Sequence, residues 1–434
     1  MHVAIFADVS LGTVGGSHSA LVAQWKSLRR LGHRVTVFAP AVDAAVVDPD
    51  LVVLEGVSGW RTDGSVLVVP NGANAAAIDA AFAERGPVDV VHVLTASGAG
   101  IAGLHAARRH GIPLVQTLRR HDDALVERYS VLRLVSASIL RHLRGGHRAA
   151  QPLSGRAQAA DRVVTPTRGL ARKLVAAGVR RPIHVVPNGI DDELLDAAPD
   201  PRFTLPDPHA ESTAAQQPLR ILWCGRFALE KRPLAALEAV RLALDAAPGG
   251  CTLDMYGAGP LLDRAWSFVE RHGLRDRVRL HGEVGRAECL AAMRTHDVLL
   301  SSSFGADSQH MVVQEAVAVG LPILYCDPDL DETVPDGGGV RALGPSILAL
   351  AEALGRLANT PERLAEMRKV LVGCADGVRQ STYTAELVSI YRQAIERGPG
   401  SWRETARDTT QATLFACPLR VATDPLIAWP GDAR

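Results

Sequence analysis

Short β-branched runs alternate with longer amphipathic segments along the chain, and this alternation constrains the fold more than any other feature. Helix-like segments at residues 18–31, 99–110 and 169–177 lie between the strand-like runs of the first half. Strands that alternate with helices predict βαβ units, and therefore an α/β fold with parallel sheets. The strand-like runs of the first half are residues 3–6, 35–38, 88–93, 113–116, 162–165 and 184–186.

A second series of the same kind begins after a proline-rich connector at residues 197–218. Such a connector resists regular structure. We therefore expect two doubly wound domains, residues 1–196 and 219–380, followed by a helix over 381–397 that returns toward the first domain and a tail over 398–434. The strand-like runs of the second series are residues 219–224, 252–256, 278–282, 298–301 and 322–325.

Composition excludes several classes of function. The chain has 434 residues, zero formal net charge and 47% hydrophobic residues, so it is globular and lacks the basic excess that nucleic-acid binding needs. No apolar run is long enough to span a bilayer, and the N-terminus has no basic region typical of a signal peptide. Six cysteines are scattered without a CxxC motif, which favours core thiols in a reducing compartment. We therefore expect a cytoplasmic protein.

Two carboxylates, Asp307 and Glu315, are separated by seven residues and precede the sequence Gly320-Leu-Pro322. An acid that ends a loop and a second acid in the following helix can face one pocket. A carboxylate accepts hydrogen bonds from two hydroxyls at once. The pair therefore favours a ligand rich in hydroxyl groups.

Gly225 and Arg226 come directly after a predicted strand, where a doubly wound sheet binds its ligand, and Lys231 follows five residues later. Arginine offers a fixed fork for phosphate oxygens and lysine a compact charge. The pair could stabilise a departing diphosphate without a metal. The alternative is a solvated pair of cations near the start of a helix.

Three glycine motifs have both a functional and a structural interpretation. Gly15-Gly16 follows a predicted strand and precedes a helix, where backbone amides can approach an anion. Gly257-Ala-Gly-Pro260 also ends a predicted strand and opens a helix, but a single GxGP is a weak signal. Each is equally typical of a tight turn, as is Pro187-Asn-Gly-Ile-Asp191. Asp327-Pro-Asp329 is similar to a metal-binding DxD motif, but we interpret it as a loop after a strand and expect no metal.

The order and spacing of these motifs resemble one family, the retaining glycosyltransferases of the GT-B fold, specifically family 4 (glycosyltransferase group 1). The resemblance covers roughly residues 1–395 and implies two Rossmann-like domains that face a central cleft. It rests on Gly15-Gly16, Pro187-Asn-Gly-Ile-Asp191, Gly225-Arg226 with Lys231, Gly257-Ala-Gly-Pro260, and Asp307 and Glu315 before Gly320-Leu-Pro322.

The resemblance implies a role for each matching position. Arg226 and Lys231 would hold the donor diphosphate as catalytic cations, and the Gly16 amide would close on it. Glu315 would bind the ribose hydroxyls, and Asp307 would lie beside the transferred sugar. Other donor-binding positions would be Gly15, Gly225, Gly257, Gly259, His310, Met311 and Val312.

The chain departs from the family pattern at three places. Asp307 stands where the family usually has glutamate, and Ser308-Gln309-His310 replaces the usual small-aromatic-glycine stretch. Arg119 stands where a histidine is common, and His121 follows two residues later. His121 could replace that histidine, Arg119 could contact the sugar or phosphate itself, or His121 could be only a loop residue.

The resemblance implies transfer of a sugar from a nucleotide sugar, for which we expect a UDP-sugar, to a hydroxyl of a small-molecule, glycan or lipid-linked acceptor. Configuration would be retained, with no metal and no cofactor beyond the co-substrate. The alternatives are a nucleotide-sugar epimerase or a catalytically silent nucleotide-sugar-binding protein. Apolar residues at helical spacing over 125–148, with arginines between them, indicate either a peripheral membrane contact or a helix bordering the acceptor pocket.

Overall fold

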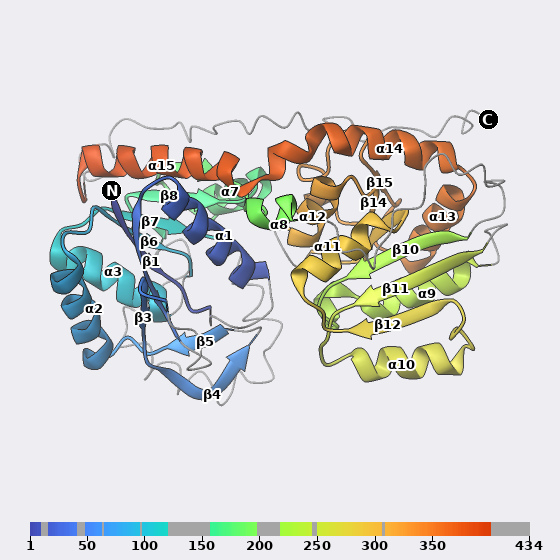
Figure 1. The fold of residues 1–434 in the computed structure, drawn as a ribbon, viewed down its shortest axis with the longest axis horizontal. Coiled ribbons are helices and arrows are strands. Elements are labelled where there is room, and N and C mark those ends of the chain that lie inside the picture. The colour runs from blue at the N-terminus through green and yellow to red at the C-terminus, as the bar shows by residue number, and fades with distance from the viewer. Residues whose placement is uncertain are drawn as a thin grey trace. The chain divides into compact units, whose positions relative to one another are not determined.

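The computed structural model describes residues 1–9, 16–40, 48–62, 65–95, 98–119, 157–197, 218–244, 250–305 and 309–400. Within these residues the chain forms two compact units, which are described separately (Figure 1). The first contains Met1–Asp192 and a segment that starts at Gln380, and the second contains Glu193–Arg379. Predictions for Gly15, His121, Asp307, the stretch 125–148, Cys417 and most of the connector and tail lie outside the described residues.

The first unit contains a parallel sheet whose described strands run in the order β3-β2-β1-β6-β7-β8-β9. The chain order reverses between β1 and β6: β1 pairs with β2 on one side and with β6 on the other. This reversal is the mark of a doubly wound sheet. The strands are β1 (His2–Phe6), β2 (Arg34–Ala39), β3 (Leu51–Val53), β6 (Val90–Val93), β7 (Leu114–Thr117), β8 (Arg162–Thr165) and β9 (Ile183–Val185).

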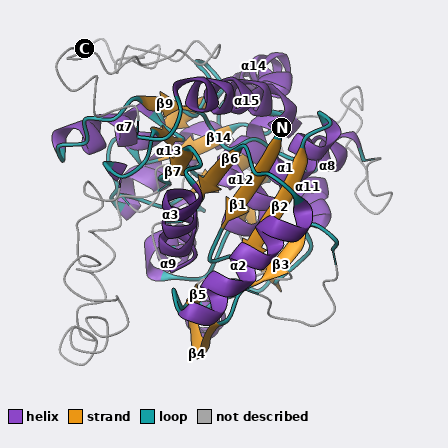
Figure 2. Cartoon of the chain, turned by 90° about the vertical axis from the view of Figure 1, so that its left-hand side faces the viewer, coloured by secondary structure: helices purple, strands orange, loops and turns teal. Residues whose placement is uncertain are grey.

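Successive strand residues point to opposite faces of the sheet, and apolar residues occupy both faces. Helices therefore cover both faces. Phe6 and Phe38 pack on one face with α2 (Gly72–Arg85), α3 (Gly98–His110) and α7 (Arg168–Ala176). Figure 2 shows α2 and α3 alongside each other. The other face packs against α1 (Gly16–Arg30) and α15 (Gln380–Arg397). An antiparallel hairpin, β4 (Gly56–Thr62) and β5 (Ser65–Val68), lies after β3.

The second unit contains another parallel sheet, with described strands in the order β12-β11-β10-β13-β14-β15. Here the order reverses between β10 and β13, so both units are doubly wound and the predicted fold class is confirmed. The strands are β10 (Leu219–Cys224), β11 (Cys251–Tyr256), β12 (Val278–Gly282), β13 (Val298–Ser301), β14 (Ile323–Tyr325) and β15 (Gly339–Arg341).

Two layers of helices enclose the second sheet. One hydrophobic cluster joins it to α9 (Pro233–Ala243), α10 (Leu262–Arg271) and α13 (Ile347–Ala358). A second cluster joins the opposite face to α11 (Arg286–Arg294) and α12 (Met311–Val319), with α14 (Pro361–Cys374) against α12. A short helix, α8 (Asp192–Asp196), lies where the two units meet in sequence. Within the described ranges, every helix is too short or too polar to cross a membrane.

Candidate functional site

The reversal of strand order in the second sheet defines the place where a ligand is expected. β10 and β13 are adjacent and parallel, with Ile221 opposite Val298. The loops that leave their carboxyl ends diverge to opposite sides of the sheet, which leaves a crevice there in doubly wound folds. Gly225 and Arg226 follow β10 directly, so the sequence motif stands at this position.

The loops after β10 and β11 fit against each other through their backbones. The amide of Phe227 donates to the carbonyl of Ala258 at 2.8 Å, and that of Leu261 to Phe227 at 2.8 Å. A Cβ on Gly257 would lie 1.9 Å from the carbonyl oxygen of Gly225, and Gly257 has φ 131°. Glycine is therefore required at residue 257 for the two loops to meet.

Gly259 has the same structural role one step further along the loop. A Cβ at Gly259 would lie 2.7 Å from the carbonyl oxygen of Phe227, and its φ is 147°. These contacts account for both glycines of the Gly257-Ala-Gly-Pro260 motif by loop packing, which agrees with the structural interpretation. The two glycines therefore let the loop after β11 pack closely against the loop that contains Gly225 and Arg226.

The two predicted cations lie in one short segment. Lys231 ends a single 3₁₀ turn, Leu229–Lys231. Its Cγ would be 3.9 Å from a Cβ placed on Gly225, so the lysine stem extends over that glycine. Arg226 and Lys231 therefore lie in the same loop after β10.

Arg226 has an acidic neighbour that the sequence interpretation missed. Its Nη2 forms an ion pair with Oε1 of Glu230, four residues later. Burial raises the pKa of the Glu230 carboxyl, but the hydrogen bond and charge of Arg226 outweigh it and hold that pKa below its usual value. The i, i+4 spacing was the signal that could have revealed this pair.

Ser302 connects the loops that follow β10 and β13. Its hydroxyl donates to the carbonyl of Lys231 at 2.8 Å and accepts from Nε1 of Trp223 at 3.0 Å. Nη1 of Arg232 donates to the Ser302 carbonyl at 3.2 Å. Arg232 has φ 51°, the left-handed region that is uncommon outside glycine. These contacts fix the position of Lys231 relative to the sheet.

Glu315, the second predicted acid, lies on α12 and is held by a cation. Nε of Arg286, the first residue of α11, donates to its Oε1 at 2.7 Å. The side chains of Arg286 and Glu315 are 21% and 9% exposed. Within the described residues, Nη2 of Arg286 is buried without a hydrogen-bond partner. Arg286 therefore provides the counter-charge that a mostly buried carboxylate requires.

His310, Met311 and Val312 form the start of α12. His310 is the N-cap residue, is 2% exposed and has Nδ1 at 3.4 Å from Oγ of Ser301. Met311 and Val312 occupy the first turn, where backbone amides have no acceptor within the helix. The predicted backbone donors therefore stand at a helix N-terminus next to the end of β13.

Asp327 serves as a loop cap. Its carboxylate accepts from the amides of Gly305 at 2.6 Å and Asp329 at 3.0 Å. These contacts place the Asp327-Pro-Asp329 sequence in a turn after β14. Within the described residues, no group of three or more His, Cys, Asp or Glu side chains has an arrangement suited to a metal ion.

Two predicted residues of the first unit follow strands of its sheet. Gly16 is the first residue of α1, after β1. Arg119 lies just beyond β7, and burial lowers the pKa of its guanidinium to about 10, so it remains a cation at neutral pH. Burial and then the charge of Arg119 lower the pKa of His92 on β6 to about 3. Arg119 therefore lies at the carboxyl edge of β6 and β7.

The Pro187-Asn-Gly-Ile-Asp191 segment has a structural role in the first unit. The Gly189 amide donates to Oε1 of Gln380 at 3.1 Å, and the Gln380 amide donates to the carbonyl of Ile190 at 2.8 Å. Asp191 pairs with Arg30 at 2.8 Å and Lys26 at 3.3 Å, both on α1. The segment joins the start of α15 to α1.

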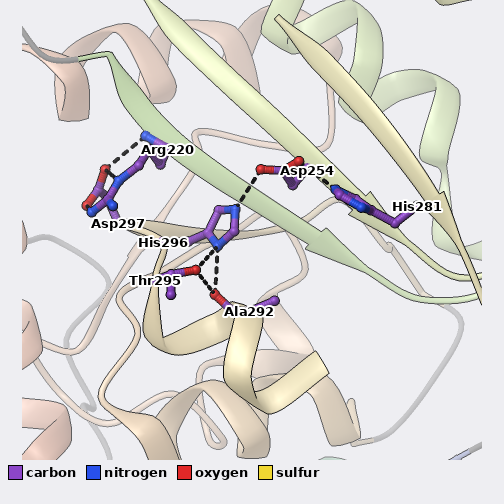
Figure 3. Close-up of polar contacts among 7 residues, drawn as sticks. All are labelled: Arg220, Asp254, His281, Ala292, Thr295, His296 and Asp297. Carbon is purple, nitrogen blue, oxygen red and sulfur yellow. Dashed lines mark hydrogen bonds and ion pairs between the residues drawn. The ribbon is translucent and has the colours of Figure 1, made fainter. Parts of the chain in front are cut away.

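A further polar cluster, not predicted from sequence, fastens the end of α11 to the second sheet (Figure 3). Asp254 on β11 contacts Nε2 of His281 at 2.7 Å and of His296 at 3.0 Å. Nδ1 of His296 faces the carbonyl of Ala292 at 2.7 Å. Burial raises the pKa of Asp254, but hydrogen bonds from His296 and His281 outweigh it and leave that pKa lowered.

Family models match most of the described chain. The model described as "Glycosyltransferase Family 4" matches residues 14–194. The model described as "Glycosyl transferases group 1" matches residues 218–360. The first covers the first unit from α1 to the start of α8, and the second covers Gly225, Lys231 and Glu315.

Curated relatives and a solved structure agree with these matches. The chain is 29% identical over 361 residues, 79% of it and 81% of the relative, to a "GDP-mannose-dependent alpha-mannosyltransferase" of Mycobacterium tuberculosis. It is 24% identical to a "Phosphatidyl-myo-inositol mannosyltransferase" of Mycobacterium leprae, over 92% of this chain and 98% of that one. Its fold is similar to sucrose-phosphate synthase from Thermosynechococcus elongatus, with TM-score 0.67, 18% identity and coverage of 91% and 99%.

Proposed function

The chain belongs to the group 1 glycosyltransferases of family 4, and we propose that it transfers a mannosyl group from GDP-mannose to a hydroxyl of a glycan or lipid-linked acceptor. The names of two relatives, a GDP-mannose-dependent mannosyltransferase and a phosphatidyl-myo-inositol mannosyltransferase, support this donor and acceptor class. The UDP-sugar expected from the sequence stays a prediction and is the other donor to test.

The observation that carries the proposal is the placement of Arg226 and Lys231 on the loop at the strand-order reversal. When the bond from the anomeric carbon to the phosphate oxygen breaks, negative charge grows on the departing diphosphate. Two fixed cations stabilise that charge more in the transition state than in the ground state. The acceptor hydroxyl then attacks the same face, and a phosphate oxygen takes its proton, as in retaining family members.

Glu315 is proposed to hold the ribose. One carboxylate oxygen accepts from Arg286, and the carboxylate as a whole can accept further hydrogen bonds from vicinal hydroxyls. The ion pair supports this role by holding the carboxylate in one orientation. The roles expected of Gly16, Asp307, His121 and Arg119 stay predictions from the family resemblance.

Donor identity is tested by a thermal-shift panel of GDP-mannose, GDP-glucose, UDP-glucose and UDP-N-acetylglucosamine with the full chain. A ligand that binds only the folded state raises the melting temperature with its affinity. We expect GDP-mannose to give the largest rise. A larger rise with a UDP-sugar would reverse the donor assignment, and no rise with any of the four would contradict the proposal.

The role of the cations is tested by Lys231→Ala and Arg226→Ala. Each should slow release of nucleoside diphosphate from the donor about a hundredfold, because one preorganised charge contact to the developing anion is lost. Lys369→Ala, which alters an exposed lysine on α14, is the matched control and should leave the rate unchanged. Near-normal rates in both loop variants would exclude this assignment.

A further inference from the structure

Two cysteines from neighbouring elements meet beside the loop proposed to bind the donor diphosphate. Cys224 is the last residue of β10, directly before Gly225, and Cys289 lies on α11. Their sulfur atoms are 2.6 Å apart. This separation is about 0.5 Å longer than the S–S bond of a disulfide. A relative shift of about 0.5 Å between the two elements therefore brings the sulfurs to bonding distance.

The other buried cysteines of this unit have different surroundings. The Sγ atom of Cys251 faces the carbonyl of Val240 at 4.0 Å, and that of Cys326 faces the carbonyl of Ser303 at 3.4 Å. Among the described cysteines, Cys224 and Cys289 are the ones whose sulfurs contact each other. Cysteines spread over the sequence thus form a specific pair only through the packing of α11 on β10.

The two thiols differ in accessibility. Cys289 is 5% exposed, whereas Cys224 is partly exposed. The hydrogen bond with Cys224, followed by burial, raises the pKa of the Cys289 thiol well above its usual value. A small oxidant therefore meets Cys224 first, and Cys289 stands behind it as the resolving thiol.

We propose that Cys224 and Cys289 form a reversible disulfide by exchange with a low-molecular-weight disulfide. The Cys224 thiolate attacks one sulfur of the small disulfide and releases one small thiol, leaving a mixed disulfide. The Cys289 thiolate then attacks Sγ of Cys224 and releases the second small thiol. Two protein thiols are oxidised, one small disulfide is reduced to two thiols, and the thiol protons pass to the released thiolates.

The cross-link has a defined route to the donor site, and this part rests on the proposed function. β10 is hydrogen-bonded on both sides, to β11 and β13, so it resists displacement. The shortening between the sulfurs must therefore move α11. That helix begins at Arg286, which holds Glu315. Oxidation accordingly displaces the partner of the proposed ribose ligand and weakens binding of the nucleotide.

The experiment uses the full chain equilibrated with glutathione and glutathione disulfide at several ratios, then alkylated. Peptide mapping without reduction should find a peptide linked through Cys224 and Cys289, and dithiothreitol should remove it. The Kd of GDP, measured by calorimetry, should rise about tenfold on oxidation and recover on reduction, as expected for a sub-ångström displacement of a binding group. The same measurement with UDP covers the other nucleotide that the donor could carry.

Cys224→Ala and Cys289→Ala should each abolish the redox response of the Kd, whereas Cys251→Ala should keep it. A mixed disulfide of Cys224 with glutathione, without a bond to Cys289, would overturn the proposal. So would the absence of the Cys224–Cys289 disulfide at every ratio of glutathione to glutathione disulfide. A link that leaves the Kd unchanged would refute the route through α11. If the reduced protein binds no nucleotide while the link forms, the proposed function fails and the disulfide stands. Peptide mapping of the unmutated chain shows whether the disulfide forms even if a cysteine variant misfolds.

Discussion

Arg286 and Glu315 form an ion pair whose value depends on its partial burial. A surface ion pair contributes little to stability because water already solvates both charges. Here Glu315 is 9% exposed, so removal of Arg286 leaves a carboxylate that is poorly solvated and free to reorient. Arg286 is therefore expected to act as a positioning residue for the ribose ligand.

Arg286→Ala should weaken GDP binding roughly tenfold, because the uncompensated carboxylate loses its fixed orientation. Arg286→Lys should restore part of the affinity, since it keeps the charge but not the fork. In a double-mutant cycle with Glu315→Ala, the second substitution should add little. Calorimetry measures the Kd values, with Arg264→Ala on α10 as an exposed control. Fully additive losses would show that the two residues act independently.

Sequence spacing predicted a donor-binding role for Gly225, Arg226, Lys231 and Glu315, because each belongs to a local motif. It could not reveal Arg286, which is 29 residues from Glu315 and reaches it only because α11 and α12 pack on the same sheet face. The same holds for Ser302, which follows a different strand from the cations it supports. Contacts that depend on strand order have no local signal.

Gly257 shows how one residue shapes an element at the site. Gly257→Ala should lower the free energy of unfolding of the second unit by at least about 2 kcal/mol, because a Cβ would meet the Gly225 carbonyl and φ 131° is strained for alanine. Gly373→Ala is the control. Gly373 lies within α14 with open space around it, so the substitution should raise the free energy of unfolding by about 0.5–1 kcal/mol. Urea denaturation measures both.

A fall in urea midpoint for Gly257→Ala no larger than for an exposed substitution would mean that the two loops can separate. Loss of GDP binding at temperatures where the variant remains folded would further indicate that loop contact, rather than stability alone, positions Arg226. The Gly259 contact, which is less severe at 2.7 Å, predicts a smaller effect for Gly259→Ala.

At the same scale, strong local patterns predicted the central strands and the edge strands β9 and β12, whereas the edge strands β3 and β15 were missed. β1, β10 and β13 are apolar runs buried on both faces, which is how a parallel core strand is recognised. β15 is three residues beginning with Gly339, and it exists through pairing with β14. β3 and the β4–β5 hairpin were missed for a similar reason: pairing partners, rather than periodicity, make these segments strands.

On the scale of the whole molecule, two buried histidines with lowered pKa values, His92 and His184, make the first unit sensitive to acid. His92 is 0% exposed and contacts the Tyr391 hydroxyl at 2.6 Å and that of Thr117 at 2.7 Å. Burial and the charge of Arg119 lower its pKa to about 3, and burial and Arg162 lower that of His184 to about 4. The second unit instead has Asp254, whose pKa lies below 3.8.

The sign of the pH dependence follows from these directions. A histidine with a folded-state pKa of about 3 and an ordinary value of 6.5 binds its proton more readily in the unfolded chain. Its neutral form therefore contributes full stability above pH 6.5, and that contribution is lost as the pH falls toward 3. Asp254 contributes above 3.8 and loses its contribution only at lower pH. Mild acid should thus weaken the first unit.

Between pH 7.5 and 5.0 we expect His92 alone to cost the first unit about 2 kcal/mol of unfolding free energy, since about 1.5 pH units lie below its unfolded pKa. His92→Gln, which keeps a polar side chain without titrating, should be less stable at pH 7.5 but lose about 2 kcal/mol less on acidification. His272→Gln, at an exposed position, is the control. Urea denaturation followed by tryptophan fluorescence measures the acid loss of each protein. Equal losses in all three would mean that His92 takes up its proton as readily in the folded state as in the unfolded chain, and that the acid sensitivity arises elsewhere.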